Sequence, residues 1–259
     1  MDAVSARVIR DAGTPDSLWV PWLRRQAIRP VPMTELCPDG SRLVVVAPHP
    51  DDEVLGCGGL LTMHAKRGLP SLIVAVTDGE ASHGTADLRA CAILGARRAE
   101  ESYAGLRTLG VAACSVVRLG IPDGEAMRYV DTITQKLGSL LKTSDVVVTT
   151  WRLDGHPDHE AVGEAARRAS IAAGCRLLQA PVWMWHWAEP GDARIPWKDL
   201  VALELPETTI QAKQDALRCH QTQLEARSGG LGPVLVSSIR ERAARACEYF
   251  FQCAPSHAK

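Results

Sequence analysis

Residues 43–53 read Leu-Val-Val-Val-Ala-Pro-His-Pro-Asp-Asp-Glu, an apolar run that leads directly into an acidic cluster with a histidine. A short aliphatic run that ends at a proline is typical of a strand buried on both faces of a sheet. The arrangement recurs later, where the strand-like residues 145–150 are followed by His-Pro-Asp-His at residues 156–159. An open α/β sheet gathers its chemistry at the carboxyl ends of its strands, so we expect the two clusters to meet in one crevice.

The whole chain alternates between strand and helix patterns, with glycines at several helix ends. This succession predicts an α/β fold, in which a parallel sheet with right-handed crossovers carries helices on both faces. We expect strands over residues 43–47, 72–76, 114–118, 145–150, 176–185 and 199–205. We expect helices over residues 54–67, 86–109, 125–141, 159–173, 207–227 and 238–250.

The first 40 residues differ in composition from the rest. They contain five prolines together with Trp19 and Trp22, which suits an extended arm with a short helix that packs onto a body formed elsewhere. A chain of 259 residues is long enough to build one large core. We therefore expect a capping arm over residues 1–40 and a single domain over residues 41–259.

The charges of the chain are balanced and scattered. Lys and Arg number 29, Asp and Glu number 30, and neither sign runs in blocks. We therefore expect no nucleic acid and no membrane surface as a partner, and a small molecule as the substrate. The sequence leaves the oligomeric state open, and a homo-oligomer is one of the alternatives.

The cysteines and the apolar stretches bear on localisation. The eight cysteines form no C-x-x-C pair, and scattered thiols in this number are typical of a reduced intracellular protein. No stretch approaches the roughly 20 apolar residues of a membrane span. Charged residues at positions 2, 7, 10 and 11 stand where a signal peptide would need an apolar core. We expect a cytoplasmic protein.

The first cluster has the side chains of a catalytic zinc site. Zinc in hydrolases is held by three protein ligands, histidine nitrogens and carboxylate oxygens among them, and a water keeps the fourth position. His49, Asp52 and His159 would supply that set. Asp51 is the candidate for the base that takes the proton of the attacking water. Fe²⁺ suits the same ligands, so the preferred metal stays open between the two.

The second cluster brings two histidines three residues apart to the start of a helix. Both can then face the same crevice, with His159 as a ligand and His156 toward the developing oxyanion or the leaving group. Asp158 could hold an imidazole in the needed tautomer, which completes a catalytic set of Asp51, His156 and Asp158. A surface turn before a helix would explain either cluster alone, but both clusters follow buried strands.

These motifs carry a family resemblance. Residues 47–53 together with residues 156–159 resemble the LmbE-like, or PIG-L, family of zinc-dependent N-acetylglucosaminyl deacetylases, and the resemblance covers roughly residues 42–225. It implies a Rossmann-like, doubly wound fold with a mostly parallel sheet. It also implies zinc on His49, Asp52 and His159, the base at Asp51, and an imidazole at His156 that stabilises the transition state.

Two weaker motifs extend the resemblance. Arg98 begins an R-x-x-E pattern on a helix, and Asp123 lies in a loop that reads Leu-Gly-Ile-Pro-Asp-Gly over residues 119–124. The resemblance implies that both side chains contact the substrate. A surface ion pair for Arg98 and an ordinary Pro-Asp-Gly turn for Asp123 are the alternatives. A tyrosine that some members place before the second motif has no counterpart in residues 151–155. We expect no membrane anchor of the kind that eukaryotic members carry.

Other functions compete with this interpretation. Residues 56–59 read Gly-Cys-Gly-Gly, but the third glycine of a dinucleotide-binding loop is replaced by Leu61, and Asp51 and Asp52 would repel a pyrophosphate. A serine hydrolase lacks its G-x-S-x-G turn. A metal-free binding protein on the same fold would not need the complete ligand set and base.

We therefore expect a hydrolase that removes an N-acetyl group from an amino sugar or a sugar-containing small metabolite by attack of zinc-bound water. The alternative is a zinc amidase or deacylase that acts on a larger amide, such as a thiol conjugate or a longer N-acyl chain. We expect the loops near residues 79–87, 151–155 and 186–197 to decide substrate size.

A run of tryptophans and one further histidine stand apart from these motifs. Trp183, Trp185 and Trp187 alternate with other residues, so on a strand the three indoles would line one face and serve either sugar stacking or core packing. His186 would lie on the opposite face. We interpret His220 as a core histidine with its hydrogen bonds satisfied.

Overall fold

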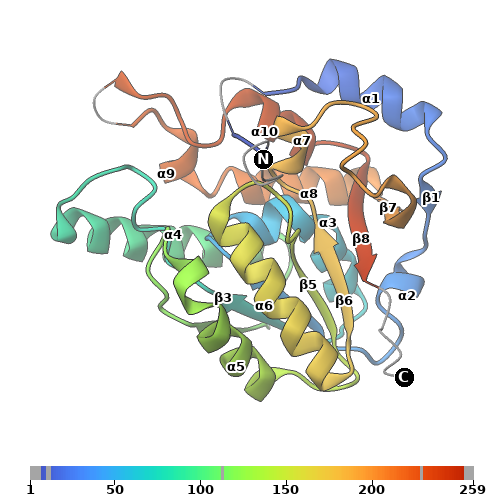
Figure 1. The fold of residues 1–259 in the computed structure, drawn as a ribbon, viewed down its shortest axis with the longest axis horizontal. Helices are drawn as coiled ribbons and strands as arrows, with labels where there is room; N and C mark the ends of the chain where they lie inside the picture. Colours follow the sequence, from blue (N-terminus) through green and yellow to red (C-terminus); the bar gives the residue numbers. More distant parts are fainter. Residues whose placement is uncertain (1–6, 10–12, 112–113, 228–229, 254–259) are drawn as a thin grey trace.

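The computed structural model describes residues 7–9, 13–111, 114–227 and 230–253, and its centre is an eight-stranded sheet (Figure 1). The strands follow the order β1-β7-β8-β6-β5-β2-β3-β4, and the pairs are parallel except that β8 is antiparallel to both β6 and β7. The strands are β1 (Arg29–Pro30), β2 (Leu43–Ala47), β3 (Ser71–Ala75), β4 (Ser115–Arg118), β5 (Val146–Thr150), β6 (Arg176–Ala180), β7 (Leu200–Glu204) and β8 (Cys247–Cys253).

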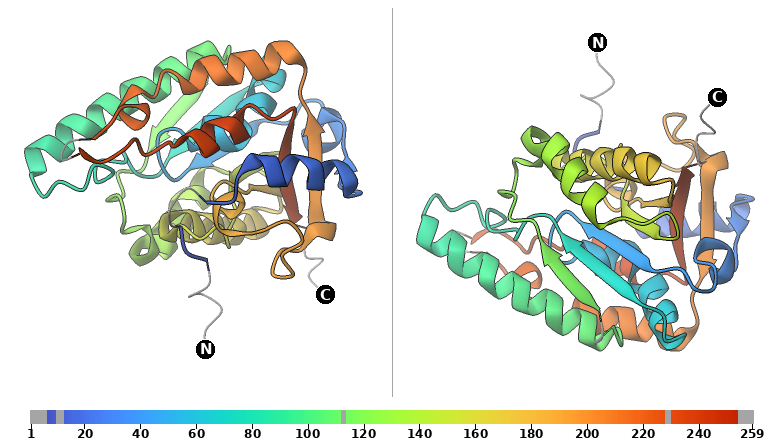
Figure 2. Two further views of the ribbon diagram at one scale, coloured as in Figure 1. Left: turned by 90° about the horizontal axis from the view of Figure 1, so that it is seen from above. Right: turned by 90° about the horizontal axis from the view of Figure 1, so that it is seen from below.

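Helices cover both faces of the sheet (Figure 2). Helices α5 and α6 lie side by side on one face, and α3, α4 and α8 lie on the other, each group above its own apolar cluster. The predicted α/β fold with helices on both faces is therefore confirmed. The α-helices are α1 (Asp16–Arg25), α2 (Met33–Leu36), α3 (Asp52–Lys66), α4 (Leu88–Thr108), α5 (Val130–Leu140), α6 (Pro157–Ala173), α7 (Met184–Trp187), α8 (Glu207–Leu217), α9 (Gln221–Leu224) and α10 (Ser237–Ala243).

The strand order puts the two motif-bearing loops next to each other. All five residues of β2 are buried, and β2 pairs in parallel with β5, with Val45 opposite Val148. From β2 the chain moves outward to β3 and β4 on one side, and β6 lies beyond β5 on the other. The loops that leave β2 and β5 therefore diverge at a switch point of the sheet, where such folds open a crevice for ligands.

The region after β6 differs from the prediction. The strand expected over residues 176–185 ends at Ala180, and residues 184–187 form the short helix α7. The expected stripe of three indoles on one strand face is therefore wrong. The backbone N–H groups of residues 182, 183 and 184 donate to the carboxylate of Asp154 instead of to a neighbouring strand. The Asp154 carboxylate, which comes from the loop after β5, thus ends the strand that the alternating local sequence predicts.

The C-terminal part also differs from the prediction. The helix expected over residues 207–227 ends at Leu217, and the helix expected over residues 238–250 ends at Ala243. The chain then enters the sheet as β8, between β6 and β7. Phe250 and Phe251 are buried there on opposite faces, in two different apolar clusters. Consecutive aromatic residues favour this buried strand over the continuation of a helix.

The N-terminal segment packs against the same body. Trp19 on α1 is fully buried, and its indole N–H donates to the Trp185 carbonyl at 2.8 Å. Strand β1 extends the sheet by pairing in parallel with β7. None of the helices in the described ranges combines the length and the apolar character that crossing a bilayer requires.

Candidate metal centre

The three predicted metal ligands lie together at the switch point. His49 stands in the loop after β2, Asp52 is the first residue of α3, and His159 lies in the first turn of α6. The Asp52 Oδ2 atom is 3.2 Å from His49 Nδ1 and 3.2 Å from His159 Nε2. Two donor atoms bound to one tetrahedral zinc at about 2.0–2.1 Å stand roughly 3.3 Å apart. Both contacts therefore have the spacing of atoms that share a metal ion.

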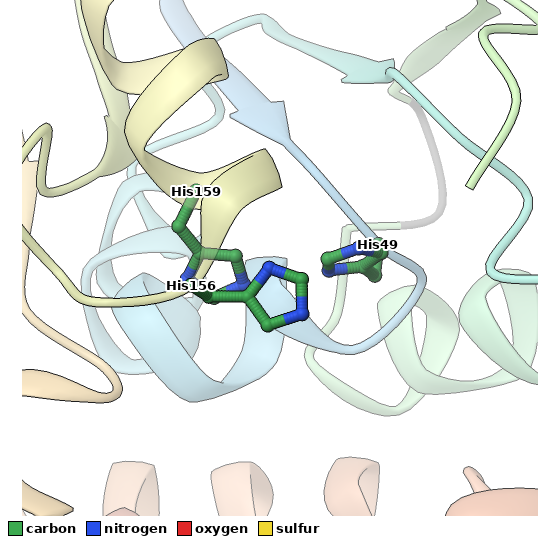
Figure 3. Close-up of side chains that lie close together, drawn as sticks. All are labelled: His49, His156 and His159. Carbon is green, nitrogen blue, oxygen red and sulfur yellow. The ribbon is translucent and has the colours of Figure 1, made fainter. Parts of the chain in front are cut away.

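Three imidazoles gather around this point. Ring nitrogens of His49, His156 and His159 lie within 4.8 Å of one another, two of the rings reaching in from the start of α6 and one from the loop after β2 (Figure 3). The carboxylate of Asp52 lies beside this group of histidines, where it contacts two of them, His49 and His159. Imidazole nitrogens with a carboxylate oxygen are the donor set of catalytic zinc and of non-haem iron(II). The residues present therefore fit a divalent metal.

Asp154 holds His159 from behind. Its Oδ2 atom lies 2.8 Å from His159 Nδ1, so the other ring nitrogen, Nε2, is the one that faces Asp52. Burial lowers the pKa of His159, but Asp52 and Asp154 outweigh burial and raise this pKa to about 9. A carboxylate on the remote nitrogen is the usual partner of a metal-bound histidine. Asp154 is not among the residues predicted from the sequence, although its place two residues before the second cluster is a usable signal.

Asp158 and Asp123 hold the second ring nitrogen of His49. His49 Nε2 is 3.2 Å from Asp158 and 3.1 Å from Asp123. Asp158 also accepts the backbone N–H groups of Gly124 and Ala126, which ties the Asp123 loop to α6. Burial lowers the pKa of His49, but these carboxylates and Asp52 raise it well above its ordinary value. The imidazole that Asp158 contacts is thus His49, and a contact of Asp123 with the substrate stays a prediction.

Asp51, the predicted base, stands in a strained backbone conformation. Its φ of 140° is positive, which non-glycine residues rarely adopt and which strained functional positions do. Its backbone N–H donates to Glu53 at 3.0 Å, and Glu53 is held in turn by the Ser102 hydroxyl. Burial raises the pKa of Asp51, Arg98 lowers it and Asp52 raises it again, so that it stands at about 7.

Arg98 holds the loop that carries Asp51. Its side chain is 3% exposed, and it donates to the carbonyls of Gly79 and Pro50 at 2.9 Å each and to Asp51 Oδ2 at 3.2 Å. The surface ion pair considered as an alternative is therefore wrong, because both partners are buried. Arg98 also lines the cavity described below, and its contact with a substrate stays a prediction.

His156 is the N-cap of α6 and faces the crevice as a neutral imidazole. Its Nδ1 atom accepts the backbone N–H of Asp158 at 3.2 Å, so the ring proton resides on Nε2. Burial lowers the pKa of His156, and the neighbouring His159 and His49 lower it further, to about 3. At neutral pH this side chain is therefore a hydrogen-bond donor without a charge.

A cavity of about 310 Å³ opens onto these side chains. The predicted residues that line it are His49, Asp51, Asp52, Arg98, Asp123, His156 and His159. Of the three loops expected to set substrate size, the loop over residues 79–87 contributes Ala81 and Ser82. The cavity is also lined by Trp183, one of the indoles considered for sugar stacking, and by Gln223, Arg227, Val234 and Leu235, which were not predicted from the sequence.

The sequence is similar to a known protein family and to several of its members. The model of the family "PIG-L: GlcNAc-PI de-N-acetylase" matches residues 44–170. A 1D-myo-inositol 2-acetamido-2-deoxy-alpha-D-glucopyranoside deacetylase of Corynebacterium efficiens is 30% identical over 240 residues, which cover 74% of this chain and 75% of the relative. A probable N-acetyl-alpha-D-glucosaminyl L-malate deacetylase of Bacillus subtilis is 29% identical over 197 residues, which cover 71% of this chain and 84% of the relative.

Solved structures share the fold. The N,N'-diacetylchitobiose deacetylase from Pyrococcus horikoshii superposes with a TM-score of 0.59 over 84% of this chain and 85% of its own, at 20% identity. A conserved protein from Thermus thermophilus superposes with a TM-score of 0.57 over 84% of this chain and 96% of its own, at 26% identity. The sheet and the helices that cover it are therefore an architecture shared with these proteins.

Proposed function

Because the chain belongs to the PIG-L family of deacetylases, we propose that it removes the N-acetyl group from an amino sugar or a sugar-containing small metabolite. The observation that carries this proposal is the position of Asp51. A carboxyl group with a pKa of about 7 lines the same cavity as the imidazole and carboxylate donors His49, Asp52 and His159. A base with a pKa near neutrality beside a metal-binding cluster is suited to hydrolysis of an amide by a metal-bound water.

His49, Asp52 and His159 would hold a zinc ion, which when bound polarises the amide carbonyl and lowers the pKa of a coordinated water. Asp154 and Asp158 keep the two histidine rings turned toward the ligand positions, since each accepts from the ring nitrogen on the far side. Because the imidazole rings of His49 and His159 are already oriented, they need not rotate when the substrate binds.

Asp51 would act as the base in the first step and as the acid in the second. It removes a proton from the attacking water, and it returns that proton to the amide nitrogen as the carbon–nitrogen bond breaks. Arg98 limits the movement of this carboxylate, because the guanidinium also holds the carbonyl of Pro50, directly before Asp51, and the carbonyl of Gly79 in the loop after β3. The carboxylate that would transfer the proton is therefore held in one position.

His156 would stabilise the negative charge that develops on the amide oxygen. Its Nδ1 atom is occupied by the backbone N–H of Asp158, so the Nε2–H is free to donate into the cavity. A preorganised donor aimed at developing charge is a large contribution to catalysis in buried sites.

The cavity favours one sugar unit with the remainder of the substrate projecting outward. Its 310 Å³ lies at the lower end of the range of about 300–1,000 Å³ for small-molecule pockets. Asp123, Gln223 and Arg227 line the cavity and offer polar groups for sugar hydroxyls. Relatives named for N-acetylglucosamine conjugates support the same substrate class.

The test is mass spectrometry of a panel of substrates incubated with the zinc-loaded protein. The panel contains N-acetylglucosamine, its inositol and malate glycosides, longer N-acyl glucosamines and thiol-conjugate amides. We expect loss of the acetyl mass from a glucosamine-containing substrate, and no loss with the Asp51→Asn variant. Cleavage confined to the longer acyl chains or to the thiol conjugates would contradict the proposal in favour of a larger-amide hydrolase.

A further inference from the structure

Helix α3, which starts at the metal site, is broken in its second turn. Cys57 has φ −151° and ψ 24°, which is not helical, so residues 52–56 and 58–66 form two helical pieces. A continuous helix would pair the N–H of each residue with the carbonyl four residues earlier. At the break, the N–H groups of Gly59 and Leu60 and the carbonyl of Leu55 are bonded to side chains of other elements.

A buried ion pair takes over these backbone groups. Glu248 on β8 accepts the N–H of Gly59 at 2.7 Å and that of Leu60 at 2.8 Å, one on each carboxylate oxygen. Lys213 on α8 donates to the Leu55 carbonyl at 3.1 Å and to Glu248 at 2.6 Å. The lysine and glutamate side chains are 4% and 3% exposed. The pair therefore bridges both sides of the break.

The glycines at the break make room for this pair. A Cβ atom on Gly59 would lie 2.6 Å from the Leu205 side chain and 3.0 Å from the Glu248 carboxyl carbon. A Cβ atom on Gly58 would lie 3.3 Å from the Lys213 side chain. The Gly-Cys-Gly-Gly run over residues 56–59 resembled part of a nucleotide-binding loop. In the structure, its glycines instead allow the side chains of Lys213 and Glu248 to approach the backbone of α3 closely.

The energetics favour a positional role over a stabilising one. Two charges taken from water regain little more than their desolvation cost, and apolar residues of the same size often give an equally stable protein. An apolar pair, however, would leave the two N–H groups and the carbonyl at the break without partners, which is costly in a buried place. The ion pair is therefore suited to fixing the geometry of the break.

We propose that Lys213 and Glu248 are positioning residues that fix the direction of the first turn of α3, and through it the places of Asp51 and Asp52 at the metal site. The piece over residues 52–56 is only five residues long, so its orientation depends on what holds its end. The inference rests on the proposed function for its activity readout, but metal affinity and amide exchange test it independently.

The central variant is Glu248→Gln, which keeps the size of the side chain but loses a charge and one of the two acceptor oxygens. Its matched control is Asp145→Asn on the opposite end of the sheet. Asp145 is equally buried, pairs with Arg42 and accepts the backbone N–H of Lys142, and these bonds do not involve α3. Both variants should lower the melting temperature.

Only Glu248→Gln should change the metal site. At a temperature well below both melting points, we expect its kcat to fall about 100-fold, the effect of misplacing a catalytic group by roughly 1 Å. We expect its Zn²⁺ affinity, measured by competition with a chromophoric chelator, to fall roughly tenfold or more. Amides of residues 52–56 should exchange faster by mass spectrometry, while Asp145→Asn keeps the wild-type kcat, affinity and exchange in that segment.

A double variant separates charge balance from geometry. Lys213→Met with Glu248→Gln removes both charges and should recover part of the melting temperature, but kcat and Zn²⁺ affinity should stay low because one N–H still lacks its acceptor. Gly59→Ala should act in the same direction, whereas Gly138→Ala on α5, where a Cβ meets nothing within 4 Å, should leave kcat, Zn²⁺ affinity and exchange over residues 52–56 unchanged.

Wild-type affinity and wild-type exchange over residues 52–56 in Glu248→Gln would overturn the inference, because the pair would then serve stability alone. Failure of the wild-type protein to cleave any acetylated substrate would instead contradict the proposed function. In that case the affinity and exchange measurements still decide whether the ion pair positions α3.

Discussion

Helices α3 and α6 perform the same task in different ways. Each follows a strand at the switch point and brings a predicted zinc ligand to the crevice in its first turn. Helix α6 runs unbroken for 17 residues, with His156 as N-cap, Pro157 in the first turn and Gly174 in the left-handed conformation at its end. Helix α3 has an N-cap at Asp51 that makes no side-chain capping bond, and it is broken at Cys57.

The difference lies in where the support comes from. The signals that form α6 are local, since a capping side chain, a proline at the start and a glycine at the end are all within the helix or beside it. The start of α3 is held by Arg98 on α4, and its break is held by Lys213 on α8 and Glu248 on β8. We conclude that the α6 half of the site is self-supporting and that the α3 half depends on distant elements.

The largest effect is expected at the start of α3. Asp51→Asn keeps the shape of the side chain but removes the base, so we expect kcat to fall about 1,000-fold, within the range known for general bases. The Zn²⁺ content by elemental analysis should stay at the wild-type level. Asp131→Asn on the exposed surface of α5 is the control and should be fully active. A loss below tenfold would remove Asp51 as the base.

The next effect is expected on the α6 side. Asp154→Asn weakens the acceptor behind His159, so we expect Zn²⁺ affinity to fall about 10–100-fold in a chelator competition. Because this support is local, amide exchange over residues 52–56 should not change. Faster exchange in the first turn of α3 would show that the two halves of the site are coupled, which would contradict the comparison.

The pH dependence of activity tests whether Arg98 controls the pKa of Asp51 at the start of α3. Arg98 lowers the pKa of Asp51, so Arg98→Gln should raise it. Asp51 must be ionised to act as the base, hence activity is lost as pH falls through its pKa. The acid limb of kcat/KM should therefore move to higher pH in Arg98→Gln. An unchanged limb would show that another group controls the acid side of the profile.

The smallest effect is expected at the far end of α6. Gly174 has φ 67°, and an alanine there would cost about 1–2 kcal/mol of unfolding free energy because L-residues disfavour this conformation. The metal site should not respond, since α6 is fixed at its start. Urea unfolding and kcat of Gly174→Ala measure the two quantities, and a lowered kcat would contradict the local character of α6.

The parts of the fold that follow from local signals were predictable. The aliphatic run of β2 and the proline and glycine that bound α6 gave elements whose ends agree with the structure to within two residues. The nearness of the two histidine clusters followed from the rule that parallel strands present their carboxyl ends at one edge. His49, Asp52 and His159 could be brought together on that basis alone.

The parts that depend on distant partners were not predictable. The turn that leads into α7 is held by Asp154, which accepts the backbone N–H groups of residues 182–184, and the break in α3 is stabilised by Glu248, almost 190 residues further along the chain. The chain turns back after Leu217, which brings Gln223 and Leu235 over the cavity, and no local pattern specifies that return. His220 was expected to be buried with its hydrogen bonds satisfied; it is fully buried, but among the described residues neither ring nitrogen has a hydrogen-bond partner.

The backbone of Asp51 has a consequence for how this protein can change. A positive φ costs a non-glycine residue about 1–3 kcal/mol, and a glycine would adopt it freely. Replacing Asp51 by glycine would release this strain, but it would also leave the buried Arg98 guanidinium without its carboxylate partner and the site without its base. The strained backbone is thus retained because the same carboxylate pairs with Arg98 and faces the metal site.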